Sequence, residues 1–494
     1  MDRDPGNLTA KEVTRRINDA KSYALAIGEA AVDIVVSLLL LILVGRAYGP
    51  SGLGVYSFLL SIFVIVSFLA EFGVGKYLEK ELAGKRREDV HRLLAEAKGV
   101  ILFSGLLGGL ATLMLGKWVV GASVLTRGGW PGIYVLALAV PLNLYSGFQT
   151  SVLHGRGDHA AASRAGLIKR LVLLGSIFFL AGTRIRPDLL VTAFVFSECA
   201  HILLVKRAVR MPSIIAALKM MRTAGTTIRK SLPFYFTHEG LRVLFFVDFF
   251  ILGFFVTAVQ EGSYAEASVL SRLFLIIPLG VAPLFRVRLY SSKGVDSERI
   301  FVNLRRTAAR FFSLHSIVAL AFLLYFPHIL RAVFKIQGDI PIFFRIFSLL
   351  LPGLLLFSST VVLEPLFSLD SREQGLNRIA LKVFLINAFL NFYLIPYAGV
   401  FGAAIATTLS LVIYFFLFAH GIGGKGAIPI KAYLLSGTLV YVAYHILDSA
   451  RMPVLLVIPL ITVVLPLLFG ILGLYGQGEG RRAEGEGEKE VPGA

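Results

Sequence analysis

Long apolar runs that contain no charged residue determine what this chain can fold into. Three of them occupy residues 53–70, 133–153 and 454–474, and each matches the roughly 20 residues that span the hydrocarbon of a bilayer. Only 16% of the residues are charged, well below the roughly 25% of soluble domains. The sequence therefore predicts an all-α integral membrane protein.

About fourteen transmembrane helices are predicted from these runs. They are placed at residues 24–44, 53–73, 98–116, 130–152, 165–183, 187–205, 232–253, 262–285, 308–328, 342–364, 376–396, 398–420, 431–448 and 453–475. The domains expected from this pattern are a cytoplasmic interfacial segment (1–23), an N-terminal six-helix bundle (24–205), a basic cytoplasmic linker (206–231), a C-terminal six-helix bundle (232–420), two additional helices (431–475) and a disordered cytoplasmic tail (476–494).

The formal net charge of +18 would suggest nucleic-acid binding in a soluble protein. Here the basic residues cluster between alternate apolar runs, as in loops retained in the cytoplasm. We therefore expect no nucleic-acid partner. A multi-pass protein of the cell (cytoplasmic) membrane with both termini in the cytoplasm is predicted, although Arg184, Arg186, Arg331 and Lys335 fall on the opposite side.

A weak internal repeat relates the two predicted bundles. The stretch GPSGLGVYSFLLS at residues 49–61 corresponds to AVQEGSYAEASVL at residues 258–270, which aligns Tyr56 with Tyr264 at an offset of 208. Internal repeats of this kind are common in transporters. Both bundles are expected to run in the same orientation, because the first and seventh spans both run outward.

Three stretches carry a resemblance to a known family. They are GRAYGPSGLGVYSF at residues 45–58, EGSYAEASVLSRL at residues 261–273 and NAFLNFYLIPYAGVFGAAIATTLS at residues 387–410. The sequence resembles the polysaccharide (lipid-linked sugar) flippases of the multidrug/oligosaccharidyl-lipid/polysaccharide exporter superfamily. The resemblance implies two bundles facing a central cavity and translocation of an oligosaccharide on a polyprenyl (pyro)phosphate by alternating access, for surface polysaccharide or glycan assembly. It also implies lipid-linked oligosaccharide, membrane lipids and other glycan-assembly membrane proteins as partners.

Two arginines near mid-depth are the best candidates for binding an anionic substrate. Arg242 and Arg272 each lie about ten residues into a predicted span, which is near the midplane at about 1.5 Å per residue. Charge at this depth is costly and usually functional, and guanidinium groups bind phosphate in a bidentate manner. For Arg242, a salt bridge to Glu239 on the same helix face is an equal alternative.

Acidic residues inside spans are candidates for ion coupling or gating. Glu29 and Asp33 lie four residues apart on one face of the first span, where they are expected to carry a coupling Na+ or H+ or to form a gating ion pair across the cavity. Glu198 is a similar candidate in the sixth span, whereas Asp248 is expected to have a structural partner.

Polar residues elsewhere in the spans have competing interpretations. Asn387 and Asn391 share one face of the eleventh span and serve either sugar recognition or interhelical hydrogen bonding. Lys169 lies close enough to a span end for its ammonium to reach the headgroups. The histidines show no metal-ligand spacing, so neither a metal site nor a resident cofactor is expected.

The absence of certain motifs and the composition of the loops distinguish between classes of membrane protein. No nucleotide-binding P-loop is present, so transport is expected to draw on ion gradients or on product consumption. A membrane glycosyltransferase is disfavoured because residues 116–130, among the longest outer loops, contain no carboxylate, and no enzymatic activity is expected. An ion-coupled multidrug or organic cation efflux transporter shares the fold of the resembled superfamily, and a peptidoglycan lipid-precursor flippase is chemically adjacent, so both alternatives stay open.

Overall fold

The computed structural model describes residues 10–82, 87–125, 129–209, 211–235, 238–275, 278, 315, 318–319, 340–364 and 373–421. Every element within these ranges is helical, and seven of these helices are long and apolar enough to cross a membrane. The predicted all-α integral membrane fold is therefore confirmed. The predicted spans at residues 431–448 and 453–475, the tail at 476–494 and nearly all of the span at 308–328 lie outside the described residues.

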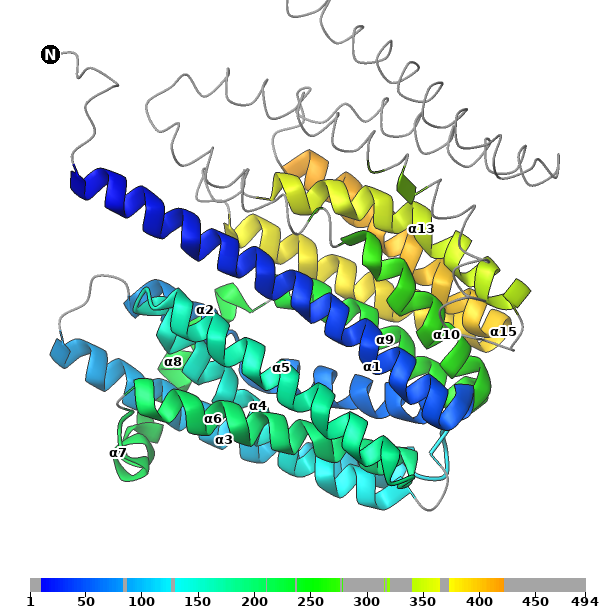
Figure 1. The fold of residues 1–494 in the computed structure, drawn as a ribbon, viewed down its shortest axis with the longest axis horizontal. Helices are drawn as coiled ribbons and strands as arrows, with labels where there is room; N and C mark the ends of the chain where they lie inside the picture. The colour runs from blue at the N-terminus through cyan, green and yellow to red at the C-terminus, as the bar shows by residue number, and fades with distance from the viewer. Residues whose placement is uncertain are drawn as a thin grey trace, which may run out of the picture.

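Two helix groups lie on either side of the long first helix, α1 (Ala10–Glu71), as Figure 1 shows. One group consists of α3 (Arg87–Val119), α4 (Trp130–Gly155), α5 (His159–Gly182) and α6 (Thr192–Ala208). The other group consists of α9 (His238–Phe255), α10 (Ala258–Ser271), α13 (Ile340–Leu363) and α15 (Glu373–Gly421). The short helices α7 (Ile214–Lys219) and α8 (Ala224–Ser231) connect the two groups, and the short helix α2 (Val74–Leu82) connects α1 to α3. The first group belongs to the predicted N-terminal bundle and the second to the C-terminal bundle.

Glycine turns divide the two longest helices into antiparallel spans. Gly49 in α1 has a φ of 68° and is followed by Pro50, and Gly399 in α15 has a φ of 55°. Glycine tolerates this left-handed backbone because it has no Cβ. The chain folds back after Gly49, since the Leu53 side chain reaches within 4.0 Å of a Cβ placed on Gly45. The turn at Gly49 lies between two predicted spans, whereas Gly399 lies one residue inside the span predicted at residues 398–420.

The start of α10 differs from the prediction by four residues. A span beginning at residue 262 was expected, but α10 begins at Ala258. Thr257 caps this helix because its hydroxyl accepts a hydrogen bond from the amide of Gln260 at 3.3 Å. The Gln260 side chain accepts one from the amide of Thr257 at 3.0 Å. This reciprocal arrangement is a capping box, and it extends the helix into a stretch too polar to be recognised as part of a span.

The two halves meet through paired glycine contacts that repeat the offset of 208 residues. A Cβ placed on Gly54 would lie 2.0 Å from the carbonyl oxygen of Ala258, and one placed on Gly262 would lie 1.9 Å from that of Pro50. Gly262 and Ala258 are the repeat counterparts of Gly54 and Pro50. The two contacts are therefore equivalent, as a pseudo-twofold relation between the halves requires.

A second pair of contacts obeys the same rule. A Cβ on Gly45 would lie 3.5 Å from the carboxylate of Glu266, and one on Gly253 would lie 2.1 Å from the ring of Phe58. Gly253 and Glu266 again follow Gly45 and Phe58 by 208 residues. We call the surface formed by these four contacts the seam. The seam lies near Gly49, at the start of the second span of α1. Glu71 marks the opposite end of that span, since a helix rises about 1.5 Å per residue.

Candidate functional site

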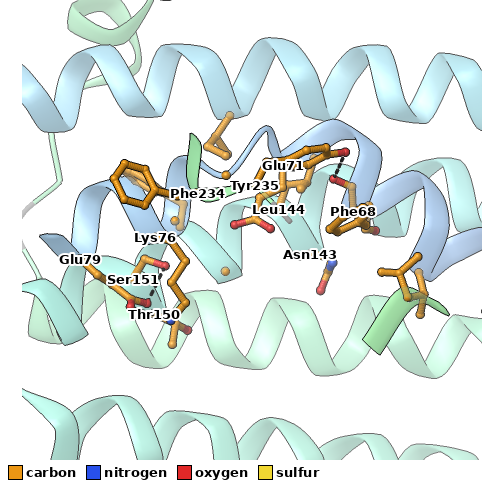
Figure 2. Close-up of a pocket in the computed structure, with 18 of the residues that line it drawn as sticks. Phe68, Glu71, Lys76, Glu79, Asn143, Leu144, Thr150, Ser151, Phe234 and Tyr235 are labelled. Atoms are coloured by element: carbon orange, nitrogen blue, oxygen red, sulfur yellow. Dashed lines mark hydrogen bonds and ion pairs between the residues drawn. The ribbon is translucent and has the colours of Figure 1, made fainter. Parts of the chain in front are cut away.

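A cavity of about 450 Å³ lies between the halves at the other end, which we call the α2 end. Its walls come from the second span of α1, from α2 and α4, and from Phe234, Tyr235, Val243 and Phe246 at the start of the C-terminal half. Figure 2 shows several of the side chains that line it. Cavities of this size, with apolar walls and a few polar groups, are typical ligand sites.

Sharp turns place α2 beside this cavity. Phe72 and Gly73 both have a left-handed backbone, with φ values of 53° and 71°, and they redirect the chain from α1 into α2. A Cβ on Gly73 would lie 2.7 Å from the carbonyl oxygen of Ser231. The hydroxyl of Ser231 donates to the carbonyl oxygen of Phe72 at 2.7 Å. The linker between the halves is thus fixed against the end of α1.

Aromatic rings from both halves form one wall of the cavity. The rings of Phe68 and Tyr235 stack with centroids 4.7 Å apart, and the Tyr235 hydroxyl donates to the carbonyl oxygen of Phe68 at 3.0 Å (Figure 2). Phe234 and Phe246 add further rings from the C-terminal half. Flat apolar faces beside polar groups suit an amphipathic ligand.

Charged and polar side chains line the rest of the cavity. Glu79 lies 2.7 Å from the ammonium of Lys76 and 3.5 Å from Nδ1 of His154. Burial acts to raise the pKa of Glu79, but the hydrogen bond with His154 and the charge and hydrogen bond of Lys76 lower it to about 2. Glu71 and Asn143 also face the cavity. The described lining therefore carries charges of both signs.

Arg272 lies just behind the cavity wall. Its guanidinium donates to the carbonyl oxygen of Phe245 at 3.1 Å and to the hydroxyl of Ser268 at 3.0 Å. It also lies 4.7 Å from the ring centroid of Phe245 and 5.4 Å from that of Phe246. Cations over aromatic faces are stabilised electrostatically. Since Phe246 lines the cavity, its ring lies between the cavity and the Arg272 guanidinium.

Asp248 is the centre of a fully buried polar cluster in the C-terminal half. It accepts hydrogen bonds from Tyr264 at 2.6 Å, from Asn391 at 2.7 Å and from Thr407. The Asn391 amide also donates to the side-chain oxygen of Asn387 at 3.1 Å. The expected structural partner of Asp248 is therefore present. Asn391 thereby forms an interhelical hydrogen bond, which was the alternative to sugar recognition, whereas the hydrogen bond between Asn387 and Asn391 stays within α15.

The same cluster offers oxygen atoms to a small cation. The side-chain oxygen of Asn391 is buried and has no hydrogen-bond partner among the described residues, while the NH2 group of the same side chain faces Asp248. Carboxylate, amide and hydroxyl oxygens are ligands for hard cations. No group of three or more His, Cys, Asp or Glu side chains is arranged for a metal ion in the part of the chain that the structure describes. Asp248, Asn391 and Thr407 bring a carboxylate, an amide and a hydroxyl group together in this cluster.

Glu198 belongs to a separate polar network in the N-terminal half. Its carboxylate lies 2.8 Å from the ammonium of Lys169 and accepts a hydrogen bond from Ser146. Thr150 and His201 form a neighbouring hydrogen bond of 3.2 Å. The prediction that Lys169 reaches the headgroups is wrong, because the side chain instead neutralises a carboxylate that is 1% exposed. Buried charges require such a partner.

The other four predicted site residues have side chains outside the described part of the structure. Glu29 and Asp33 fall on α1, and Glu239 and Arg242 fall on α9. Their proposed roles in ion coupling, gating and phosphate binding stay predictions.

Sequence reasoning missed the residues that line the cavity. Of the predicted site residues with described side chains, Arg272, Asn387, Asn391 and Glu198, none lines it. Phe68 and Tyr235 were not recognised because aromatic residues in apolar runs give no signal of their own. Glu71, an acidic residue at the end of a span and close to Lys76, was the available clue.

A helical membrane protein with two matched halves, a cavity at one end and a closed seam at the other has the architecture of a transporter. No family model matches the chain. It is 29% identical over 179 residues to the probable flippase AglR of Haloferax volcanii, which covers 34% of this chain and about a third (35%) of that relative. It is 22% identical over 395 residues to the probable low-salt glycan biosynthesis flippase Agl15 of the same organism, covering 76% of this chain and 77% of that relative.

Solved structures share the fold. The lipid II flippase MurJ in an inward closed conformation superposes with a TM-score of 0.71 at 14% identity, over 91% of this chain and 98% of that chain. The MATE multidrug transporter DinF-BH superposes with a TM-score of 0.56 at 15% identity, over 85% and 97% of the two chains. The predicted resemblance to flippases of this superfamily is thus confirmed. The relatives are flippases and transporters, which supports a protein without enzymatic activity.

Proposed function

We propose that this protein translocates a polyprenyl-(pyro)phosphate-linked oligosaccharide across the cytoplasmic membrane by alternating access, for surface polysaccharide or glycan assembly. The relatives named as glycan biosynthesis flippase and flippase support the substrate class. The observation that carries the mechanism is the position of the cavity at the α2 end, opposite the closed seam. In this proposal the α2 end and both termini face the cytoplasm.

The cavity accepts the glycan headgroup from the cytoplasmic side. Phe68, Tyr235 and Phe246 offer apolar faces to sugar rings, while Asn143 and Ser151 offer hydrogen bonds. The lipid tail stays in the bilayer, because its transfer to water would cost about 0.8 kcal/mol per CH₂ group. Opening the seam while the α2 end closes would then present the headgroup to the other side.

Arg272 and Arg242 are proposed to bind the phosphate groups of the carrier. The Arg272 guanidinium lies behind Phe246, so a rotation of this ring brings it into contact with the cavity. Phosphate oxygens would replace the carbonyl of Phe245 and the hydroxyl of Ser268 as acceptors. A phosphate adds a negative charge and a bidentate geometry that the neutral carbonyl and hydroxyl acceptors lack. The exchange is therefore favourable only when an anionic ligand is present.

Two alternative substrates have specific support. The carboxylates of Glu71 and Glu79 line the cavity, which favours an organic cation and therefore an efflux transporter. The agreement in fold with the lipid II flippase MurJ favours a peptidoglycan lipid precursor. The two alternatives predict different competitors of oligosaccharide translocation, an organic cation in one case and a peptidoglycan lipid precursor in the other.

The test is reconstitution into vesicles, in which exposure of a lipid-linked oligosaccharide on the opposite leaflet is measured. Arg272→Ala and Arg242→Ala should each slow translocation at least tenfold, because a charge-assisted contact is worth roughly 1.5–3 kcal/mol. Arg207→Ala, an exposed arginine at the end of α6, is the matched control and should leave the rate unchanged. Normal rates in both variants would exclude the phosphate-binding role.

Competition in the same vesicles separates the substrates. Excess lipid II that blocks translocation would favour a peptidoglycan precursor. If the vesicles accumulate a cationic dye and this accumulation is lost on replacement of Glu71, an efflux transporter would be favoured. The proposed function requires inhibition by polyprenyl-linked oligosaccharide and no dye transport.

A further inference from the structure

The seam is symmetric in its backbone but not in its chemistry. At the positions related by the repeat offset of 208, the N-terminal half places Leu53 and Phe58, which are 1% and 0% exposed. The C-terminal half places Glu261 and Glu266, which are 0% and 7% exposed. Two buried apolar side chains in one half are thus replaced by two buried carboxyl groups in the other.

Neither carboxyl group has a partner among the described residues. Both carboxyl oxygens of Glu261 are buried and form no hydrogen bond. Glu266 forms no hydrogen bond or ion pair there either, and a Cβ placed on Gly45 across the seam would lie 3.5 Å from its carboxylate. Buried polar groups in proteins are nearly always satisfied, so this pair needs an explanation.

Helix α10 packs against α1, α9, α13, α15 and the turn after α10 at Arg272–Leu275. The titratable side chains described on these elements and on α10 itself are Arg46, Tyr48, Tyr56, Glu71, Asp248, Tyr264, Arg272, Arg345, Arg378, Lys382, Tyr393, Tyr397, Tyr414 and His420. None of them is hydrogen-bonded or ion-paired to Glu261 or Glu266. Without an ion-paired cation among the described residues, an ionised carboxylate in an apolar interface is very costly, and the group takes up a proton instead.

Opening the seam would change the surroundings of both groups. Glu261 is adjacent to Gly262, whose backbone contacts Pro50 across the seam, and Glu266 faces Gly45 of α1. If α1 and α10 separate at the Gly49 end, water reaches both carboxyl groups. A hydrated carboxyl group near neutral pH loses its proton.

We propose that Glu261 and Glu266 form a proton-binding pair that holds the seam closed when protonated and releases it when ionised. Each carboxylate takes one proton from the water on the Gly49 side as the seam closes, and returns it when the seam opens. Acid on that side therefore favours the conformation with the cavity at the α2 end. This inference rests on the proposed function only in treating the seam as the gate of a transporter.

The experiment measures seam opening directly and needs no substrate. Ser51 and Val259 are exposed, lie on the two helices of the seam and are related by the repeat offset. Spin labels on Ser51→Cys and Val259→Cys, with the single native cysteine removed by Cys199→Ser, report the distance between α1 and α10. Measurements are made in lipid nanodiscs over a pH series from about 5 to about 9, a range that includes values on both sides of neutral pH.

Rising pH should convert a short-distance population into a longer one. Proton linkage predicts that the ratio of open to closed molecules increases up to about tenfold per pH unit for each proton released. Glu261→Gln and Glu266→Gln should each lower this slope by about half, and the double variant should abolish it. The matched control Leu53→Gln places the same amide at the repeat counterpart of Glu261 and should retain the full slope.

A distance distribution that does not change with pH in the parent protein would overturn the inference. So would an unchanged slope in the double variant. Size-exclusion chromatography shows whether each variant is folded, and the pH series on the parent protein decides the question even if a variant is not. A pH-dependent seam without glycan translocation would reject the proposed substrate while leaving the proton-binding pair intact.

Discussion

Alanine at Gly54 or at Gly262 should force the two halves apart at the Gly49 end. The Cβ of Gly54→Ala would lie 2.0 Å from the carbonyl oxygen of Ala258, and that of Gly262→Ala 1.9 Å from that of Pro50. Ordinary contact begins at 3.4 Å, and the obstructing atom is backbone in both cases. Neither clash can be relieved by rotating a side chain, so the helices must separate.

The expected energy follows from this geometry. Adding a methyl group to a well-packed interface costs typically 1–3 kcal/mol, and here the cost applies only to the conformation with a closed seam. The population with an open seam should therefore increase about 5- to 150-fold. Because the two contacts are repeat counterparts, the two variants should have similar effects.

Labelling of a buried position measures this change. Leu53 is 1% exposed in the seam, so a cysteine in its place, in a Cys199→Ser background, reacts with a membrane-impermeant thiol reagent only when the seam opens. The labelling rate should increase about 5- to 150-fold in either glycine variant, in proportion to the open population. Gly175→Ala, where no atom lies within 4 Å of the added Cβ, is the control for the general effect of alanine in a helix. If the seam variants label no faster than this control, the seam does not close one side of the transporter.

Three further predictions concern the buried and partly buried charges. The pKa of Glu79 is about 2 in the folded protein against 4.5 normally, so its stabilisation, on the order of 1–3 kcal/mol, is complete above about pH 4.5 and lost as pH falls toward 2. Melting curves of Glu79→Gln should lack this acid dependence, and an unchanged dependence would refute the assignment. Lys169→Met should destabilise the protein by about 1–3 kcal/mol, and adding Glu198→Gln should restore part of it; simple additivity of the two changes would show that the pair is not coupled. Na+ should raise the melting temperature relative to K+ in the parent protein but not in Asp248→Asn, whereas equal melting in both salts for the parent would exclude a sodium site there.

Several features of the fold were predictable because they depend only on local sequence. Uncharged runs of about 20 residues define spans, since burial in lipid is decided by composition. Gly49, which lies between two of these runs, marks a turn because glycine adopts the left-handed backbone without strain, whereas the turn at Gly399 falls inside a predicted span. The offset of 208 residues, predicted from Tyr56 and Tyr264, recurs in all four seam contacts.

The candidate site was less predictable because its residues interact across long sequence separations. Asn391 and Asp248 are 143 residues apart and lie on different helices. Depth in a span indicates that a charged residue needs a partner, but it does not identify the partner. Lys169 and Glu198 were thus both noticed, yet their ion pair was not foreseen.

The sequence by itself determined the class of the molecule: its location in a membrane, its helical spans, its turns and its duplication. These follow from the free energy of transferring each segment from water to lipid and from backbone conformations of single residues. Only the tertiary structure decided where the cavity lies, which charges pair and which carboxyl groups have no partner. Such features depend on the packing of helices against each other, and the hydrophobic pattern of each helix leaves that packing undetermined.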